Sequence, residues 1–151
     1  MRPVVERLSP NHNTRTHDIR LIVMHADAAP TEASCLSWIR SSVSKVSYHY
    51  LVGRDGTVYR CVPDGRRAWH AGKAVWQGEK DVNGISLGLC FSNRNDGKEP
   101  LTAAQQVAMR ELVDELQAKY GPLDVTTHAK VSPGRKTDPE QVPGFRLEDY
   151  T

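Results

Sequence analysis

A chain of 151 residues with 38% hydrophobic and 25% charged residues has the length and composition of one soluble globular domain. The net charge of +2 is too small to indicate nucleic-acid binding. No apolar run reaches the roughly 18 residues that a membrane-spanning helix needs. We therefore expect a monomer that binds neither nucleic acid nor membrane. Three cysteines without a CxxC pair are too few for a disulfide framework, so we expect buried free thiols at Cys35, Cys61 and Cys90.

The N-terminal segment is polar and lacks the uninterrupted apolar core of a secretory signal peptide. We therefore expect synthesis in the cytoplasm, and any action outside the cell would need release by another route. Residues 1–17 are rich in turn formers and predict an N-terminal arm. The rest of the chain, residues 18–151, is expected to form the folded domain.

The first half of this domain predicts one strand, one helix and one hairpin. A β-branched apolar run at 19–26 is long enough only for a buried strand. Thr31 is a helix cap, and the helix is expected to reach about Ser42, with Cys35, Leu36, Trp38 and Ile39 near one face. Alternating residues over 47–62, with a tight turn at Arg54-Asp55-Gly56, predict a β-hairpin.

The second half predicts a strand at 85–92, a long helix at 102–121 and a last strand at 123–128. Thr102 and Gln105 form a capping box, an apolar stripe that includes Val107 is expected to face the core, and Gly121 ends the helix. A short helical turn follows within 144–150. The order β-α-β-β-β-α-β indicates a single α/β domain with a central mixed β-sheet flanked by helices.

Two histidines stand at the ends of predicted strands, His25 after the first and His128 after the last. Each alone is typical of a hydrogen-bonded histidine at a strand end. Asp138 follows His128 in the loop HAKVSPGRKTDP, and two imidazoles with one carboxylate form a ligand set of catalytic zinc, which leaves a fourth position open. If the first and last strands are neighbours in the sheet, these residues predict a Zn²⁺ site.

Lys136 lies two residues before Asp138, so an extended backbone would point both side chains the same way. A lysine beside a metal can stabilise the oxyanion of amide hydrolysis, although a solvated loop lysine is the simpler interpretation. A water-positioning group is also needed. The candidates are Tyr48 and His49, and a core tyrosine is an equally good interpretation of Tyr48.

Several stretches resemble the zinc-dependent N-acetylmuramoyl-L-alanine amidases of type 2, which include phage lysozyme-like amidases and peptidoglycan recognition proteins. They are IVMHADA, SYHYLVGRDGTVYRCVPDGRRAWHAG, NGISLGLC, LTAAQQVAMREL and THAKVSPGRKTDPEQVPGF, in family order over residues 19–147. The resemblance implies a mixed sheet with helices on both faces and zinc at the floor of a groove. It also implies peptidoglycan, as muramyl peptide, as the substrate.

Carried over position by position, the resemblance implies His25, His128 and Asp138 as zinc ligands. It implies Lys136 and Tyr48 as catalytic residues. Segments that are similar to the family's substrate groove contain Trp69, His70 and Asn83, although His70 could also be a hydrogen-bonded loop histidine.

The chain departs from cell-wall-recycling members, which carry a glutamate after the S-[IL]-G-[IL] strand motif, because Cys90 occupies that position. We therefore expect a phage or prophage endolysin that cleaves the amide between N-acetylmuramic acid and L-alanine in the cell wall. Two alternatives are a non-catalytic peptidoglycan-binding module and a cytoplasmic muropeptide-recycling amidase. The retained ligand set disfavours the first and Cys90 disfavours the second.

Overall fold

The computed structural model describes residues 3–15 and 17–151. Its central sheet has six strands in the order β1-β5-β4-β7-β3-β8, and β2 and β6 form a separate two-stranded sheet. The elements are β1 (Val4–Glu6), β2 (His12–Thr14), β3 (Leu21–Ala26), α1 (Glu32–Ile39), β4 (Tyr50–Val52), β5 (Val58–Arg60), β6 (Arg66–Ala68), α2 (Val82–Ile85), β7 (Ser86–Phe91), α3 (Ala103–Tyr120), β8 (Asp124–Thr127), α4 (His128–Val131) and the 3₁₀ helix η1 (Leu147–Tyr150).

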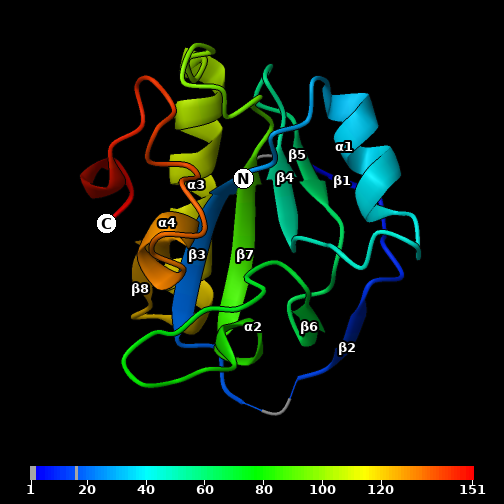
Figure 1. Ribbon diagram of the computed structural model, residues 1–151, viewed down its shortest axis with the longest axis vertical. Helices are drawn as coiled ribbons and strands as arrows, with labels where there is room; N and C mark the ends of the chain where they lie inside the picture. The colour runs from blue at the N-terminus through cyan, green and yellow to red at the C-terminus, as the bar shows by residue number, and fades with distance from the viewer. Residues whose placement is uncertain (1–2, 16) are drawn as a thin grey trace.

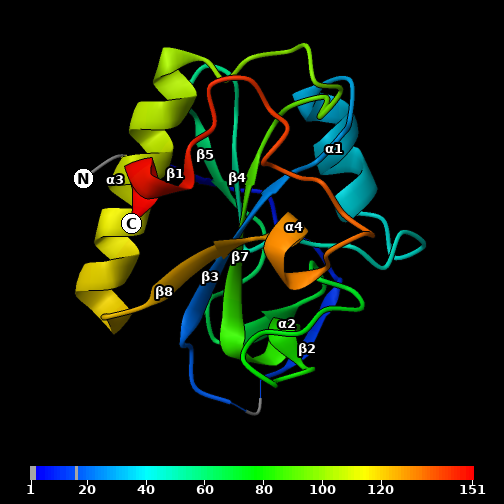
Figure 2. The same ribbon diagram turned by 60° about the vertical axis from the view of Figure 1, so that its left-hand side comes forward.

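Helices cover both faces of the central sheet, as the sequence predicts (Figure 1). Figure 2 shows α3 on one side of the sheet and α1 with α4 on the other. Alternate residues of β3 supply the two cores: Ile22 and Met24 pack on the α3 side, whereas Leu21 and Val23 belong to a smaller cluster on the opposite side. This alternation sends His25 to the face opposite α3.

Four neighbouring strands, β4, β7, β3 and β8, run parallel, so their carboxyl ends share one edge of the sheet. The pairing of β3 with β8 satisfies the condition on which the predicted zinc site depends, because the first and last predicted strands are neighbours. In doubly wound α/β folds, ligands bind at such an edge. This edge therefore positions the candidate site.

The predicted hairpin is confirmed as β4 and β5, which pair antiparallel around a turn containing Gly56. Short elements escaped prediction: β6, α2 and α4 have three or four residues each. The segment expected as an arm contains two strands within its described part, and β1 extends the central sheet beside β5.

Two predicted helix faces need correction. In α3 the Val107 side chain is 52% exposed, and Gln105 is fully buried in its place, where its amide donates to the carbonyls of Val52 and Ser92. In α1 the Trp38 side chain is 56% exposed, while Cys35 and Ile39 are buried. The capping boxes begun by Thr31 and Thr102 are both present, so helix starts were predicted better than helix faces.

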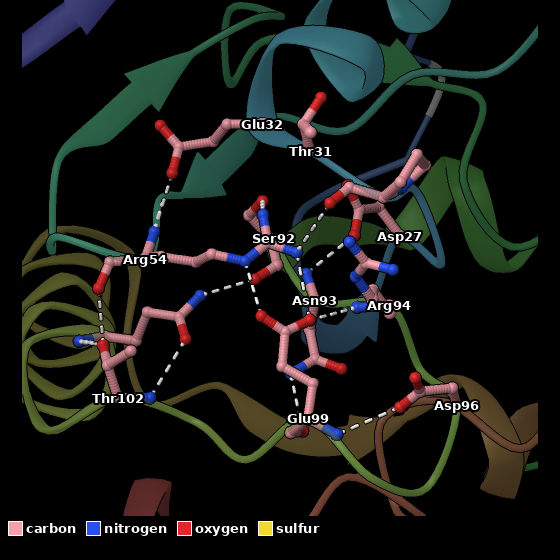
Figure 3. A network of polar contacts seen from close by, with 12 residues as sticks. Asp27, Thr31, Glu32, Arg54, Ser92, Asn93, Arg94, Asp96, Glu99 and Thr102 are labelled. Carbon is pink, nitrogen blue, oxygen red and sulfur yellow. Dashed lines mark hydrogen bonds and ion pairs between the residues drawn. The ribbon is translucent and has the colours of Figure 1, made fainter.

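A polar network ties together the loops that follow β3, β4 and β7 (Figure 3). The Arg54 guanidinium donates two hydrogen bonds to the Glu99 carboxylate, at 2.6 and 3.0 Å, and a third to Ser92 Oγ. Glu32 accepts from the Arg54 backbone N–H, and Asp27 accepts from the backbone N–H of Asn93. These contacts fix the loops at the edge where the candidate site lies.

The three cysteines are buried and free, as predicted. Among the described residues, no helix combines the length and the apolar character needed to cross a membrane.

Candidate metal centre

The predicted ligand residues meet at the carboxyl edge of the sheet. His25 is the penultimate residue of β3, His128 is the first residue of α4 directly after β8, and Asp138 lies in the loop that follows α4. The backbone N–H of Ala26 donates to the Asp138 carboxylate at 3.2 Å and ties this loop to β3. All three residues are buried, with exposures of 0, 5 and 6%.

His25, His128 and Asp138 form a triad in which each side chain points one possible ligand atom toward a common point. The Nδ1 atoms of His25 and His128 are 3.1 Å apart. His25 Nδ1 lies 3.4 Å from Asp138 Oδ2, and His128 Nδ1 lies 3.2 Å from Asp138 Oδ1. Two ligands of a tetrahedral zinc with bonds of 2.0–2.1 Å lie roughly 3.3 Å apart. The spacing of the triad therefore fits a small tetrahedral cation.

The protons of the triad can be located from the contacts of its outer nitrogens. His128 Nε2 lies 2.9 Å from the carbonyl oxygen of Ala71, which can only accept, so Nε2 carries the proton and Nδ1 is a bare lone pair. His25 Nε2 lies 2.9 Å from His70 Nδ1. These outer hydrogen bonds turn both rings with Nδ1 toward Asp138, which is the arrangement of metal-binding histidines.

Burial and charge set the protonation of these groups. Burial lowers the pKa of His25 to about 4, although the hydrogen bond to Asp138 opposes this shift. Burial favours the neutral form of Asp138, but its close contacts with the His128 and His25 rings outweigh burial and hold the pKa of Asp138 below its ordinary value. Near neutral pH the triad thus presents a neutral His25 imidazole and the Asp138 carboxylate.

A cleft of about 480 Å³ opens above the triad. Its walls contain the predicted ligand, catalytic and substrate-contact residues except the fully buried His25 and the alternative candidate His49, and they add others that the sequence did not single out. The lining side chains that matter here are Lys45, Tyr48, Trp69, His70, Asn83, Asn95, His128, Arg135, Lys136 and Asp138. The predicted metal, catalytic and substrate-contact residues therefore occupy one place in the fold.

The two predicted catalytic residues reach this cleft in different ways. Lys136 is exposed and lines the wall next to Asp138. Tyr48 is 8% exposed, its ring centroid lies 5.1 Å from that of His25, and burial raises the pKa of its phenol well above the ordinary value. Tyr48 therefore lines the cleft, and its phenol stays protonated and can donate a hydrogen bond.

The alternative water-positioning residue, His49, is occupied elsewhere. It is fully buried, its Nδ1 accepts from the backbone N–H of Gly88, and its Nε2 lies 2.8 Å from the carbonyl oxygen of Arg66. The cleft lining includes Tyr48 and does not include His49. The geometry therefore favours Tyr48 between these two candidates.

The three residues predicted to contact substrate differ in their surroundings. Trp69 is half-buried in the cleft wall. The Asn83 side-chain oxygen accepts from the backbone N–H groups of His70 and Ala71, so Asn83 holds the loop that carries both. His70 is 6% exposed and both of its ring nitrogens contact protein groups. A role in substrate contact stays a prediction for all three.

Sequence reasoning overlooked Arg135 and Ser86. Arg135 donates at 2.7 Å to the carbonyl oxygen of Ala71, which also accepts from His128, and Gly72 leaves the space in which its guanidinium lies. Ser86 Oγ lies 3.1 Å from His70 Nε2. The position of Arg135 directly before Lys136 is the sequence feature that could have pointed to it. Nothing in the sequence marks Ser86.

A family model described as N-acetylmuramoyl-L-alanine amidase matches residues 15–141. Among curated relatives, 1,6-anhydro-N-acetylmuramyl-L-alanine amidase AmpD of Enterobacter cloacae is 29% identical over 152 residues, which cover 87% of this chain and 80% of the relative. AmpD of Haemophilus influenzae is 33% identical over 70% of this chain and 57% of the relative. N-acetylmuramoyl-L-alanine amidase AmiD of Escherichia coli is 31% identical over 80% of this chain and 49% of the relative, so the chain spans about half of some relatives.

Solved structures agree with these matches. A selenomethionine derivative of AmpD superposes with a TM-score of 0.80 at 25% identity over 99% of this chain and 93% of the other. AmiD from E. coli, in complex with the substrate anhydro-N-acetylmuramic acid-L-Ala-D-gamma-Glu-L-Lys, superposes with a TM-score of 0.72 at 31% identity over 80% of this chain and 52% of the other. The mixed sheet flanked by helices is thus the fold expected from the motifs, and the chain belongs to the N-acetylmuramoyl-L-alanine amidase family.

Proposed function

We propose that this protein is a zinc-dependent amidase that cleaves the bond between N-acetylmuramic acid and L-alanine in soluble muropeptides, including those with a 1,6-anhydro sugar. The observation that carries this proposal is the triad. Its two imidazole lone pairs and one carboxylate converge within 3.4 Å of one another on the floor of a cleft. Without a cation, this buried set of three acceptors would repel itself.

His25, His128 and Asp138 would hold the zinc and leave one position of a tetrahedral site open toward the cleft. Zinc bound there supplies a Lewis acid for the scissile carbonyl and lowers the pKa of water to about 7. The nitrogen and oxygen donors suit this metal, and the outer hydrogen bonds of both histidines hold the rings in the required orientation.

Lys136 and Tyr48 supply the remaining chemistry from the cleft walls. The Lys136 ammonium is free to approach the carbonyl oxygen of a bound amide, where negative charge develops during hydrolysis. The protonated Tyr48 hydroxyl can hold the attacking water or the oxyanion by donating a hydrogen bond. Both roles place a positive charge or a donor where the tetrahedral intermediate needs it.

The relatives favour a muropeptide amidase over the expected phage endolysin. The AmpD relatives are named for a 1,6-anhydro-N-acetylmuramyl substrate, and the AmiD structure holds an anhydromuramyl tripeptide. Cys90 is the residue that disfavours this alternative in the sequence. In the structure Cys90 is buried beside Tyr48, and Tyr48 reaches the cleft from that place. A tyrosine in this position can replace a water-orienting glutamate, so Cys90 does not disfavour muropeptide hydrolysis.

The binding-module alternative lacks support from the site. A module that binds peptidoglycan without cleaving it needs the cleft but not three converging ligands. Here all three ligands are buried together, and Tyr48 and Lys136 line the same cleft. Retention of this whole set supports catalysis.

The proposal can be tested with the tripeptide anhydro-N-acetylmuramic acid-L-Ala-D-γ-Glu-L-Lys and with intact peptidoglycan sacculi, each digested by chelated protein before and after zinc is added back. Mass spectrometry should show a free peptide with a new L-alanine amino terminus only with zinc. We expect faster release from the soluble muropeptide. Efficient clearing of sacculi with little muropeptide turnover would favour the endolysin, and no new L-alanine terminus from either substrate would contradict the amidase.

A further inference from the structure

The His70 ring lies between the first triad residue and strand β7. Its Nδ1 is 2.9 Å from His25 Nε2, and its Nε2 is 3.1 Å from Ser86 Oγ. The rings of His25 and His70 meet edge to face, with centroids 4.9 Å apart and planes at 89°. His70 thus connects His25 to a hydroxyl at the start of β7, on the side away from the triad.

Ser86, the last side chain in this series of hydrogen bonds, sets the direction of each of them. Ser86 Oγ lies 2.6 Å from the carbonyl oxygen of Val82, which can only accept, so the Ser86 hydroxyl donates its single proton there. Ser86 Oγ must then accept from His70 Nε2–H. A neutral His70 ring has its lone pair on Nδ1, which accepts from His25 Nε2–H. The His25 proton is therefore held on Nε2, and the His25 Nδ1 lone pair faces the triad.

Gly88 provides the space for this arrangement. A Cβ atom at Gly88 would stand 2.6 Å from His70 Cγ and 2.7 Å from His70 Cδ2, distances that no side chain tolerates without displacement of the ring. Gly88 lies in the middle of β7, where a glycine weakens a strand unless something must come close. Its backbone N–H and carbonyl also bond to His49, so both backbone polar groups of Gly88 are fixed.

We propose that His70 and Ser86, seated on Gly88, are positioning residues that set the tautomer of His25 and thereby the affinity of the triad for zinc. This inference rests on the proposed zinc site but not on the identity of the substrate. Removing the hydrogen-bond partner of a metal-binding histidine weakens metal affinity by roughly 10- to 100-fold. We expect a loss of that size when His70 can no longer accept.

Three variants separate a hydrogen-bonding role from a packing role. His70→Leu fills the space without an acceptor, and His70→Asn returns an amide oxygen near the place of Nδ1. Ser86→Ala removes the acceptor that orients His70. Zinc affinity, measured by competition with a chromogenic chelator, should fall roughly 10- to 100-fold in His70→Leu. It should recover in part in His70→Asn and fall less in Ser86→Ala. Equal affinities of His70→Leu and wild type would overturn the proposal.

A substitution at Gly88 tests the same proposal while it keeps the polar side chains of His25, His70 and Ser86. Gly88→Ala should displace the His70 ring and weaken zinc binding, whereas Gly65→Ala, where a Cβ atom would meet nothing within 4 Å, is the matched control and should not. Circular dichroism and thermal melting identify any variant that fails to fold. Unchanged zinc affinity in a folded Gly88→Ala protein would contradict the proposal that Gly88 seats the His70 ring.

The tautomer itself can be read in metal-free wild-type protein from the ¹⁵N chemical shifts of the His25 ring. The proposal expects the proton on Nε2, and a proton on Nδ1 would contradict it. Because neither this readout nor zinc affinity involves substrate, both can succeed in a protein that cleaves no muropeptide. Conversely, amidase activity with an unaffected His70→Leu variant would remove the inference and leave the proposed function standing.

Discussion

Two polar clusters lie at the same edge of the sheet, and they differ in whether the protein itself supplies a partner for the negative charge. In the network of Figure 3, Glu99 faces the N–H groups of Arg54, so its negative charge is balanced within the protein. In the triad, His25, His128 and Asp138 turn acceptor atoms toward one another at 3.1–3.4 Å. Glu99 therefore has its counter-charge within the protein, whereas the acceptors of the triad need a cation. From this difference we infer a structural role for the first cluster and propose metal binding for the second.

The largest effect is expected from Asp138→Asn, which keeps the shape of the side chain but removes its charge. Zinc content by metal analysis should fall from one per chain to near zero, and muropeptide turnover should fall by more than roughly 100-fold, because loss of an outer partner alone reaches that size. Glu99→Gln is the matched control in the network and should keep its zinc. A full complement of zinc in Asp138→Asn would show that the triad is not the metal site.

Lys136→Ala should separate catalysis from metal binding. The variant is expected to keep its zinc and to lose roughly 100- to 1000-fold in turnover, the size of effect found for a donor to a developing oxyanion. Lys130→Ala, which removes an exposed lysine paired with Glu140, should be close to wild type in both respects. Loss of zinc from Lys136→Ala would contradict the assigned role.

Acid should destabilise the metal-free protein through buried neutral histidines such as His49, which lies behind the site. Burial lowers the pKa of His49 to about 4 from an unfolded value of 6.5, so between these pH values the unfolded chain binds more protons than the folded chain. Stability of the metal-free protein should be unaffected by His49 above pH ~6.5 and fall as pH drops toward ~4, by up to about 3 kcal/mol.

Urea unfolding from pH 7 to 4.5 measures this effect, with His49→Gln as the comparison. The variant is expected to be less stable at neutral pH but to lose less stability on acidification. A wild-type stability that is flat over this range, or one that rises as pH falls, would show that His49 is not held neutral in the folded protein.

The network should respond to mutation in stability alone. Glu99→Gln leaves Arg54 without its anionic partner, and we expect a loss of about 2 kcal/mol in the free energy of unfolding, as is usual for hydrogen bonds to charged groups. Zinc affinity should be unchanged. A large drop in zinc affinity without a drop in stability would mean that the two clusters are not independent.

Tyr48→Phe should slow turnover less than Asp138→Asn or Lys136→Ala. Loss of one hydrogen bond to water or oxyanion is expected to slow the reaction by about tenfold, with little change in unfolding free energy because the ring stays in place. A rate equal to that of wild type would return Tyr48 to a purely structural role.

The sequence predicted the ligand residues because strand ends are visible in it. The apolar runs before His25 and His128 mark strands that could be neighbours, and Asp138, in the same loop as His128, adds the carboxylate that completes a zinc ligand set. The helix starts at Thr31 and Thr102 could also be predicted from the sequence, because capping depends on residues close together in the chain.

What escaped prediction depends on contacts between distant segments. The support of His25 by His70 joins residues 45 positions apart, and Gly88 has its purpose only once that ring lies over it. Gln105 replaces Val107 in the core because two carbonyls from other elements accept from its amide. Periodicity alone assigns such a position to the apolar residue.

The triad as a zinc site is tested most directly by an anomalous difference map at the zinc absorption edge, recorded from a crystal of zinc-loaded protein. We predict one strong peak that lies within bonding distance of His25 Nδ1, His128 Nδ1 and an Asp138 carboxylate oxygen, and none in the Arg54 network. A map with no peak among these three atoms, from protein that metal analysis shows to contain zinc, would contradict the account.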